Sequence, residues 1–228
     1  MKKPIIGIVS KHYESYTTNK IDIFIRDEVK QAIFDNGGIA IGILPVEKDI
    51  NYSGDDWKYN LDYEQKKELI SQIDLCDGII LQGGAEMDNY EMIVAKYCYE
   101  KDIPCLGICA GQNAIVRAIG GTTYKIPNPE KHDKSMDEYV HSIRINKNSK
   151  FYNIVKTEEM RVNSRHKRAI KDCPMLDKVA FCEDGYPDVV ESKDKKFYIG
   201  VRFHPESLYE KDENMNNIFK SFIERCKD

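Results

Sequence analysis

The stretch CLGICAGQN, residues 105–113, decides how the sequence around it is interpreted. A short apolar run leads into Cys109, small residues follow at Ala110 and Gly111, and the sequence then continues with a helical pattern. This order is typical of a sharp turn from a buried strand into a helix, with glycine where a side chain would clash with the strand. The helix N-terminus at such a turn would favour the thiolate form of Cys109. Because free cysteine is among the most buried residue types, a merely structural role stays open for the stretch alone.

Strands and helices alternate through the first half of the chain. Apolar, β-rich runs predict strands, and the amphipathic segments between them predict helices. Strands separated by helices imply parallel pairing through crossovers, and therefore an α/β sandwich with helices on both faces of a sheet. We expect strands at 4–10, 39–46, 76–84 and 103–109, helices around 21–35, 62–73 and 90–101, and a polar surface loop at 47–60.

The second half has a different pattern, with short β-rich segments close together and one final amphipathic helix at 214–226. DGYPD at 184–188 is typical of a hairpin connection. The fold class expected is α/β, a flavodoxin-like three-layer sandwich with a mostly parallel central sheet and a smaller antiparallel β element in the C-terminal half. Residues 1–228 contain no repeat or linker, which predicts one domain. The strands of this half are expected at 139–145, 160–166, 178–184, 188–194 and 197–206.

Composition and charge exclude several classes of function. The formal net charge is −4 at pH 7 with interspersed acidic and basic residues, so neither nucleic acid nor a membrane is an expected partner. The apolar run near the N-terminus stops at Val9, which is too short for a signal peptide, and no apolar stretch approaches the roughly 20 residues that cross a membrane. The seven cysteines are odd in number and lack paired metal-type spacing. We therefore expect a reduced, cytoplasmic protein without disulfides or a bound metal.

A second motif supplies the groups that a reactive cysteine needs. FHPES, residues 203–207, follows an apolar strand and contains His204 and Glu206 on either side of a proline. Residues two apart in an extended segment point to the same side, and a carboxylate beside an imidazole fixes its tautomer and stabilises its charged form. Cys109, His204 and Glu206 are therefore predicted to form a catalytic triad.

The glycine pair Gly83–Gly84, after the third predicted strand, is the next candidate. Residues without side chains let the backbone approach a ligand and offer its N–H groups. The N–H groups of Gly84 and Ala110 would form an oxyanion hole. A plain turn is the alternative for the pair taken alone. The carboxyl ends of parallel strands meet at one edge of a sheet, so the glycine loop and the Cys109 turn should converge there.

Four motifs in order resemble the class I glutamine amidotransferase-like superfamily: GGAEMD at 83–88, GICAGQ at 107–112, VNSRH at 162–166 and FHPE at 203–206. Within it, the chain is similar to the γ-glutamyl-γ-aminobutyrate hydrolase family, from KPIIGIVS at 3–10 through almost its whole length. The resemblance implies a thiol hydrolase that cleaves a γ-glutamyl amide bond of a small molecule and needs no cofactor.

The resemblance also implies a role for each residue. Cys109 would attack the γ-carbonyl, while the N–H groups of Gly84 and Ala110 would hold the oxyanion. His204, oriented by Glu206, would protonate the departing amine and then activate water to hydrolyse the thioester. The residues implied to border the substrate are Gly83, Gln112, Asn163, Ser164, His166 and Arg168.

Several positions differ from the pattern of these families. Glutaminase subunits have glutamine four residues after the cysteine, where this chain has Asn113. The γ-glutamyl hydrolases have arginine directly after the cysteine, where this chain has Ala110. Arg168 replaces a common glutamine, and an arginine there would contact a carboxylate or phosphate through two hydrogen bonds. The three triad residues match the family pattern, whereas the differing positions leave the amine that is released from the γ-glutamyl group unidentified.

Three functions fit these features. A stand-alone hydrolase is favoured by the complete triad. A glutaminase subunit that delivers ammonia to a separate synthetase would need a partner protein, and Asn113 argues against it. A non-catalytic binding protein with the same fold would not require the three triad residues together.

The remaining histidines are assigned no chemistry. His12, His132 and His141 have no acidic residue or cysteine at ligand spacing in the sequence. A homodimer is the expected assembly, although no residue pattern specifies it.

Overall fold

Parallel pairing organises the first half of the chain, as the alternation of strands and helices predicts. The computed structural model describes residues 2–14, 21–46, 61–84, 89–136 and 138–227. The parallel part of the main sheet contains, in spatial order, β4 (Ile39–Ile43), β1 (Ile5–Val9), β5 (Gly78–Leu81), β6 (Cys105–Ile108) and β13 (Tyr198–Val201). β5, β6 and β13 are buried along their whole length, which explains their continuous apolar sequences.

Antiparallel strands continue the same sheet beyond β13. They are, in spatial order, β12 (Pro187–Glu191), β11 (Asp177–Cys182), β8 (His141–Ile145) and β9 (Glu159–Val162). β11 and β12 form the predicted hairpin, in which Gly185 has a φ of 81° that glycine adopts without strain. Two antiparallel pairs lie outside the main sheet, β2 (Lys11–Glu14) with β3 (Ile21–Phe24) and β7 (Thr122–Lys125) with β10 (Arg168–Asp172).

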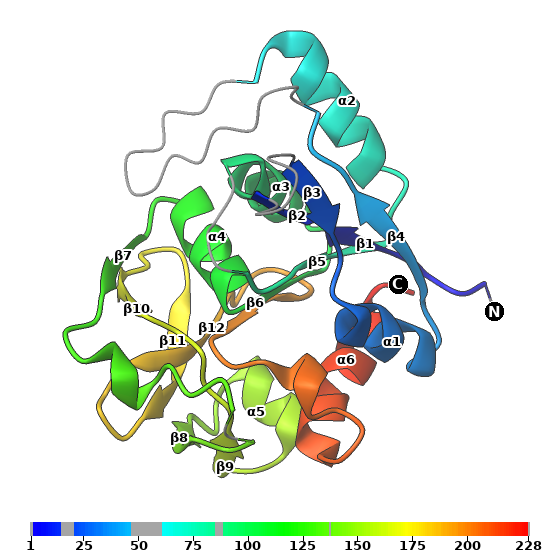
Figure 1. The fold of residues 1–228 in the computed structure, drawn as a ribbon. Helices are drawn as coiled ribbons and strands as arrows, with labels where there is room; N and C mark the ends of the chain where they lie inside the picture. Colours follow the sequence, from blue (N-terminus) through cyan, green and yellow to red (C-terminus); the bar gives the residue numbers. More distant parts are fainter. Residues whose placement is uncertain (1, 15–20, 47–60, 85–88, 137, 228) are drawn as a thin grey trace.

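Helices cover both faces of the sheet and build two cores (Figure 1). On one face lie α1 (Asp27–Asp35), α5 (Lys150–Val155) and α6 (Glu213–Arg225). On the other lie α2 (Tyr63–Ile73), α3 (Asn89–Lys101) and α4 (Ala110–Ala118). Because strand side chains alternate, Ile80 packs into the first core while its neighbours Ile79 and Leu81 pack into the second. The expected α/β three-layer sandwich with an additional antiparallel element is confirmed.

Two segments differ from their predicted elements. The helix predicted over 21–35 begins only at Asp27, because residues 21–24 pair with β2 instead. Apolar residues in this segment fit a strand as well as a helix, so tertiary pairing decides between them. The strand predicted over 160–166 ends at Val162, where the chain leaves the sheet. The polar loop predicted at 47–60 lies outside the described residues.

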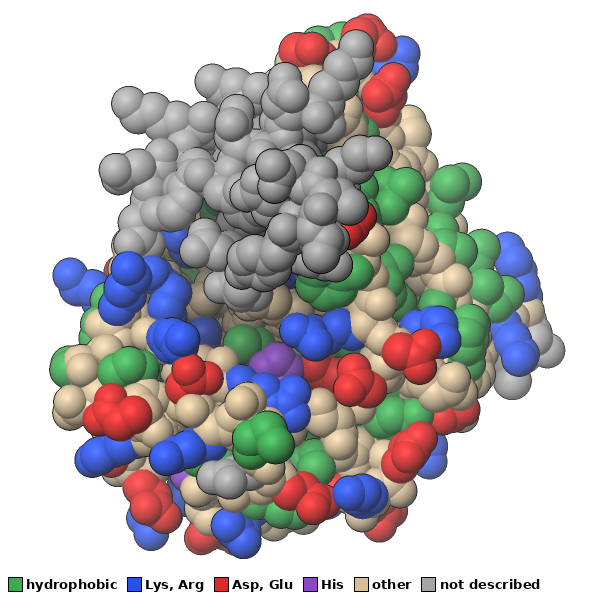
Figure 2. Space-filling model, viewed as in Figure 1, with side chains coloured by type: hydrophobic (Ala, Val, Ile, Leu, Met, Phe, Trp, Pro, Cys, Tyr) green, Lys and Arg blue, Asp and Glu red, His purple; other side chains and the backbone are tan. Residues whose placement is uncertain are grey.

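The charged surface and the cysteines have the arrangement that the composition predicts. Lysine and arginine side chains are interspersed with aspartate and glutamate over the face shown in Figure 2. All seven cysteines are free, and six of them are buried. None of the described helices combines the length and the apolar character that a membrane crossing requires.

Candidate active site

Cys109 lies at the turn that connects β6 to α4. Its backbone has a φ of 52° and a ψ of −101°, a conformation that costs on the order of 1–3 kcal/mol for a residue with a side chain. The Cys109 N–H donates to Val201 O at 2.8 Å, which ties the turn to β13. A Cβ added to Gly111 would lie 2.0 Å from Leu81 O, so only glycine permits this approach. The predicted strand-to-helix turn is confirmed.

His204 and Glu206 form a buried pair beyond the end of β13. His204 Nδ1 and Glu206 Oε1 are 2.7 Å apart, and the two side chains are 5% and 1% exposed. His204 precedes a short 3-10 turn, η2 (Pro205–Ser207), and this turn brings the carboxylate back to the imidazole. The predicted contact is present, but the extended geometry predicted for it is wrong, because Pro205 begins a helical turn.

Asn163 fixes the backbone of His204. Its Oδ1 accepts from the His204 N–H at 2.7 Å, and its Nδ2 donates to His204 O at 2.8 Å. The side chain is fully buried. These bonds assign Asn163 to positioning the histidine, whereas the resemblance implied a contact with substrate.

Gly83 lies against both Cys109 and His204. A Cβ added to Gly83 would be 2.7 Å from His204 Cε1 and 3.5 Å from Cys109 Cβ, so a side chain at this position would displace the histidine. The Cys109 and His204 side chains are close enough to shift each other's pKa. The structure therefore brings together the cysteine, the histidine and the carboxylate that the sequence singled out.

The electrostatics favour a charged cysteine–histidine pair. Burial raises the pKa of the Cys109 thiol, but the charge and hydrogen bond of His204, helped by Arg202, outweigh burial and leave the pKa below its ordinary value. Burial lowers the pKa of His204, but the charges and hydrogen bonds of Glu206 and Cys109 outweigh it and raise the pKa to about 10. Both shifts favour a thiolate beside an imidazolium over a neutral thiol and imidazole.

Arg202 is a site residue that sequence reasoning missed. Its side chain is among the largest fully buried ones, and its Nη1 donates to Asn113 Oδ1 at 2.8 Å. Its charge acts on Cys109 and on the carboxylate of Asp188. Asn113, the position that departs from the glutaminase pattern, thus anchors a buried cation near the thiolate. The available signal was a single arginine within the apolar run FYIGVRF at 197–203.

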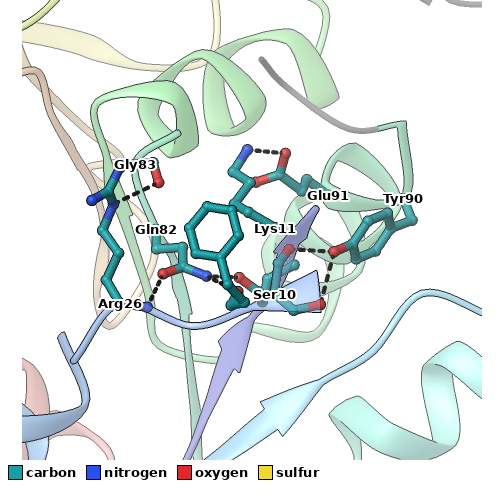
Figure 3. A network of polar contacts seen from close by, with 9 residues as sticks. Ser10, Lys11, Arg26, Gln82, Gly83, Tyr90 and Glu91 are labelled. Carbon is teal, nitrogen blue, oxygen red and sulfur yellow. Dashed lines mark hydrogen bonds and ion pairs between the residues drawn. The ribbon is translucent and has the colours of Figure 1, made fainter. Parts of the chain in front are cut away.

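A buried polar network holds the loop that carries Gly83 (Figure 3). Gln82 Nε2 donates to Val9 O at 3.0 Å and to Phe24 O at 3.1 Å, and its Oε1 accepts from Arg26 N at 2.9 Å. Arg26 Nε in turn donates to Gly83 O at 3.3 Å. The end of β1 and the connection between β3 and α1 therefore set the position of the glycine loop.

A buried ion pair borders the same loop (Figure 3). Lys11 Nζ and Glu91 Oε2 are 2.5 Å apart, and their side chains are 3% and 0% exposed. A Cβ added to Gly84 would lie 3.0 Å from Lys11 Cε, so the lysine stem packs against the glycine. Sequence reasoning missed this pair because the two residues are 80 positions apart, on β2 and α3.

Ala110 and Gly84, the residues predicted to form an oxyanion hole, occupy different elements. Ala110 is the first residue of α4, where a backbone N–H has no carbonyl of its own helix to bind and carries the positive end of the helix dipole. Gly84 follows β5 next to Gly83 and is half-buried. Their joint role stays a prediction.

Gln112 is turned into the sheet. Its Nε2 donates to Asp188 O and to Gly200 O, both at 3.0 Å, and the side chain is 0% exposed. A Cβ added to Gly200 would lie 2.7 Å from Gln112 Cγ, which shows how closely the side chain crosses β13. Gln112 Nε2 therefore fastens α4 to β12 and β13. A substrate contact for Gln112 stays a prediction.

Ser164 and His166 lie in the segment between β9 and β10, and both are buried. His166 Nδ1 is 2.9 Å from Arg168 O. Burial lowers the pKa of His166 to about 2, and the charges of Arg202 and His132 act in the same direction, so this ring is neutral. A substrate contact for either residue stays a prediction.

Arg168 lines a basic hollow of about 630 Å³. Its Nε and Nη2 lie 3.4 Å and 3.3 Å from Thr123 Oγ1. Arg117 and Lys125 line the same hollow, so three cationic side chains surround it. The hollow suits an anionic group, and its described lining does not include the Cys109 turn.

Comparison with known proteins identifies proteins that are similar to this chain in sequence and in structure. The chain is 26% identical to a glutamine amidotransferase-like protein of Rickettsia prowazekii, over 99% of both chains. It is 27% identical to the CTP synthase of Chlamydia trachomatis over 72% of this chain, which spans 36% of that enzyme. A crystal structure from Thermoplasma acidophilum, described as a GMP synthase subunit, has the same fold, with a TM-score of 0.68, 18% identity, and coverage of 100% of this chain and 96% of that one.

The family model described as Peptidase C26 matches residues 85–206. This range includes the Cys109 turn, the Asn163 segment and the His204–Glu206 pair. The chain belongs to the Peptidase C26 family, within the class I glutamine amidotransferase-like cysteine hydrolases.

Proposed function

We propose that this protein hydrolyses a γ-glutamyl amide bond of a small molecule, with Cys109 as nucleophile and His204 and Glu206 completing a catalytic triad. The observation that carries the proposal is the strained turn that presents Cys109 to a buried His204–Glu206 pair, with Gly83 packed against both. Nucleophile, base and orienting carboxylate are the parts that covalent acyl transfer requires.

In the first half of the reaction, the Cys109 thiolate attacks the γ-carbonyl carbon and a carbon–sulfur bond forms. The carbonyl oxygen takes up the electron pair, and the N–H groups of Gly84 and Ala110 stabilise its negative charge. When the carbon–nitrogen bond breaks, the His204 imidazolium gives its proton to the departing amine. A thioester and a neutral imidazole remain.

In the second half, His204 takes a proton from water and the resulting hydroxide attacks the thioester carbon. The carbon–sulfur bond breaks, which releases glutamate and restores the thiolate and the imidazolium. Glu206 stays ionised and holds the imidazole in the tautomer that directs Nε2 toward the reacting atoms. Consumption of one water and release of one glutamate and one amine balance the reaction.

The γ-glutamyl specificity rests on the resemblance of the four motifs to the γ-glutamyl-γ-aminobutyrate hydrolase family. Arg168, which the resemblance places beside the substrate, favours an amine that itself carries a carboxylate or a phosphate. An uncharged alkylamine would gain nothing from this arginine.

A matched pair of substrates tests the proposal. We expect the wild type to release glutamate from γ-glutamyl-γ-aminobutyrate faster than from γ-glutamylbutylamine, which lacks the second carboxylate. Arg168→Ala should lower kcat/KM about tenfold for the first substrate only, because one charge-assisted contact is lost. If Arg168→Ala leaves kcat/KM unchanged for both substrates, Arg168 does not contact the substrate. Absence of glutamate release and of a trapped acyl-enzyme mass on Cys109 across a panel of γ-glutamyl amides would sink the hydrolase proposal.

The similarity to CTP synthase and to a GMP synthase subunit supports a second candidate, a glutaminase that supplies ammonia to a separate synthetase. Asn113 speaks against it, since its Oδ1 is bound to Arg202 and the side chain is buried. Free glutamine is the discriminating substrate. A glutaminase would release ammonia from it, faster when its synthetase is present, whereas the hydrolase would prefer substituted amides.

A further inference from the structure

Three histidines and a cysteine converge in the antiparallel half of the sheet. His132 follows the 3-10 turn η1 (Pro129–Lys131), His141 begins β8, and Cys182 ends β11. The ring centroid of His132 is 5.3 Å from that of His141 and 5.0 Å from that of His166. These residues come from separate elements of the fold, and no spacing rule within one segment assigned chemistry to His132 or His141.

The ligand atoms of this cluster are close enough to share one metal ion. One ring nitrogen of His132, one of His141 and the Sγ of Cys182 all lie within 4.8 Å of one another. Zinc bonds of about 2.0–2.1 Å to nitrogen and about 2.3 Å to sulfur place neighbouring ligand atoms roughly 3.5 Å apart around a tetrahedral ion. Small side-chain rotations therefore suffice to close the site.

In His132 and His141, the other ring nitrogen is already held by a carboxylate. His132 Nε2 is 3.3 Å from Asp184 Oδ2, and His141 Nε2 is 2.6 Å from Asp188 Oδ2. A histidine that donates from one nitrogen to a carboxylate presents the lone pair of its other nitrogen, the arrangement found behind most metal-binding histidines. Aspartates in these positions would fix both the tautomer and the ring orientation.

The inward atoms are buried and unsatisfied. Within the described part of the chain, Nδ1 of His132 and Nδ1 of His141 have no hydrogen-bond partner, and neither has Nε2 of His166. His132 and Cys182 are 4% and 5% exposed. Buried polar atoms are ordinarily paired, so three unpaired ring nitrogens beside a thiol call for a ligand that accepts their lone pairs.

We propose that His132 Nδ1, His141 Nδ1 and Cys182 Sγ bind a zinc ion as its three protein ligands. Imidazole and thiolate ligands suit zinc, whereas magnesium and calcium prefer oxygen. The Cys182 thiol loses its proton to solvent as the sulfur–zinc bond forms, so each ion bound releases one proton. This site is independent of the proposed hydrolase activity.

The ion would join three segments of the antiparallel half: the η1 loop, β8 and β11. Asp188 connects the site to β13, because the Arg202 N–H donates to Asp188 O at 2.7 Å. Zinc would thereby stiffen the strands behind Arg202 without contacting the Cys109 thiol.

Cobalt substitution of the full-length protein is the test. Metal-free protein titrated with Co²⁺ should bind one ion and develop a thiolate-to-cobalt charge-transfer band together with the intense visible bands of tetrahedral cobalt. One equivalent of Zn²⁺ should abolish these bands and raise the thermal unfolding midpoint. Wild-type protein that binds no ion, or binds it without a thiolate band, overturns the proposal.

Matched variants locate the site. Cys182→Ser should remove the charge-transfer band, while Cys173→Ser, at another buried thiol, and Cys109→Ala should retain it. Asp184→Asn changes a half-exposed carboxylate and should weaken zinc binding about 10- to 100-fold with the fold intact. A band that disappears in Cys109→Ala, or zinc affinity unchanged in both Cys182→Ser and Asp184→Asn, contradicts the assignment.

Discussion

The parallel and antiparallel halves of the sheet differ in whether their strands bury charged side chains. Along β5 and β6, the sequences GIIL and CLGI are fully buried and carry no charged group, and the reactive thiol of Cys109 appears only beyond the strand end. β12 instead buries Asp188 and Glu191 within the strand, and Arg202 is buried directly after β13. The two halves meet at β13, which pairs parallel with β6 and antiparallel with β12.

This difference separates two tasks. The parallel half places the nucleophile through backbone geometry, with Gly111 packed on β5 and the Cys109 N–H bound to β13. The antiparallel half, which begins at β13, supplies charge through Arg202 and holds the His204 backbone through Asn163. Substitutions that disturb the nucleophile in the first half should therefore abolish activity. Substitutions that disturb Arg202 in the second half should instead shift the Cys109 pKa and the stability by smaller amounts.

The largest effect is expected where the parallel half ends. Cys109→Ala should lower kcat by at least about 10⁴-fold, because the covalent step is lost, with little change in the circular dichroism spectrum. Cys105→Ala is the control, since this thiol is buried within β6 and should be dispensable for turnover. Activity that survives in Cys109→Ala but is lost in Cys105→Ala would reverse the assignment.

Glu206→Gln should lower kcat by about 10²- to 10⁴-fold and leave measurable turnover, because the glutamate orients the base without bonding to substrate. Loss of its charge should also move the alkaline limb of the pH profile to lower pH, since Glu206 raises the pKa of His204. Steady-state kinetics across pH measure both effects. Glu210→Gln, at an exposed carboxylate, should change neither. Wild-type kcat in Glu206→Gln would remove the carboxylate from the mechanism.

The pH dependence should reflect the charged pair. Activity needs the Cys109 thiolate, whose pKa is lowered, so activity should persist below the pH at which an ordinary thiol becomes protonated. It should fall again near pH 10, where His204 loses its proton.

Stability should change with pH in a matching way. The raised pKa of His204 stabilises the fold fully below about pH 6.5, and this contribution is lost as pH rises through about 10. The lowered pKa of Cys109 contributes above the pKa of an unfolded thiol, and this contribution is lost as pH falls through the folded value. Alkylation of Cys109 that follows the pKa of an ordinary thiol would contradict the expectation for Cys109, and stability that does not fall as the pH approaches 10 would contradict the one for His204.

The smallest effect is expected where the two halves meet, at the contact between Asn113 of α4 and the buried Arg202 after β13. Asn113→Ala removes the acceptor of Arg202 Nη1 and should destabilise the fold by about 1–3 kcal/mol, because a buried donor loses its partner. Because Arg202 would be held less firmly in the variant, it should also lower the pKa of Cys109 less than it does in the wild type. Urea unfolding and the pH dependence of thiol alkylation measure the two changes. Gln31→Ala, on α1, provides a control. If both variants have the same free energy of unfolding, Asn113 does not stabilise the buried Arg202.

Local patterns predicted most of the framework. The buried strands and the helices at 62–73, 90–101 and 214–226 follow from apolar periodicity and from caps such as Asp62, whose side chain accepts from Gln65 N at 2.9 Å. β7, β10 and α5 were not predicted, because they are short and carry no clear periodic pattern.

By itself, the sequence determined the Cys109 turn, the His204–Glu206 motif and the layered α/β arrangement, because turn chemistry and hydrophobic periodicity are local properties of the chain. The tertiary structure alone decided which polar side chains meet. Arg202 reaches Asn113 across 89 positions and Asn163 reaches His204 across 41, while Gln112 turns into the sheet. His132, His141 and Cys182 come together only through the pairing of β8 with β11 and the η1 loop. Such contacts depend on strand order, which no spacing within a single segment encodes.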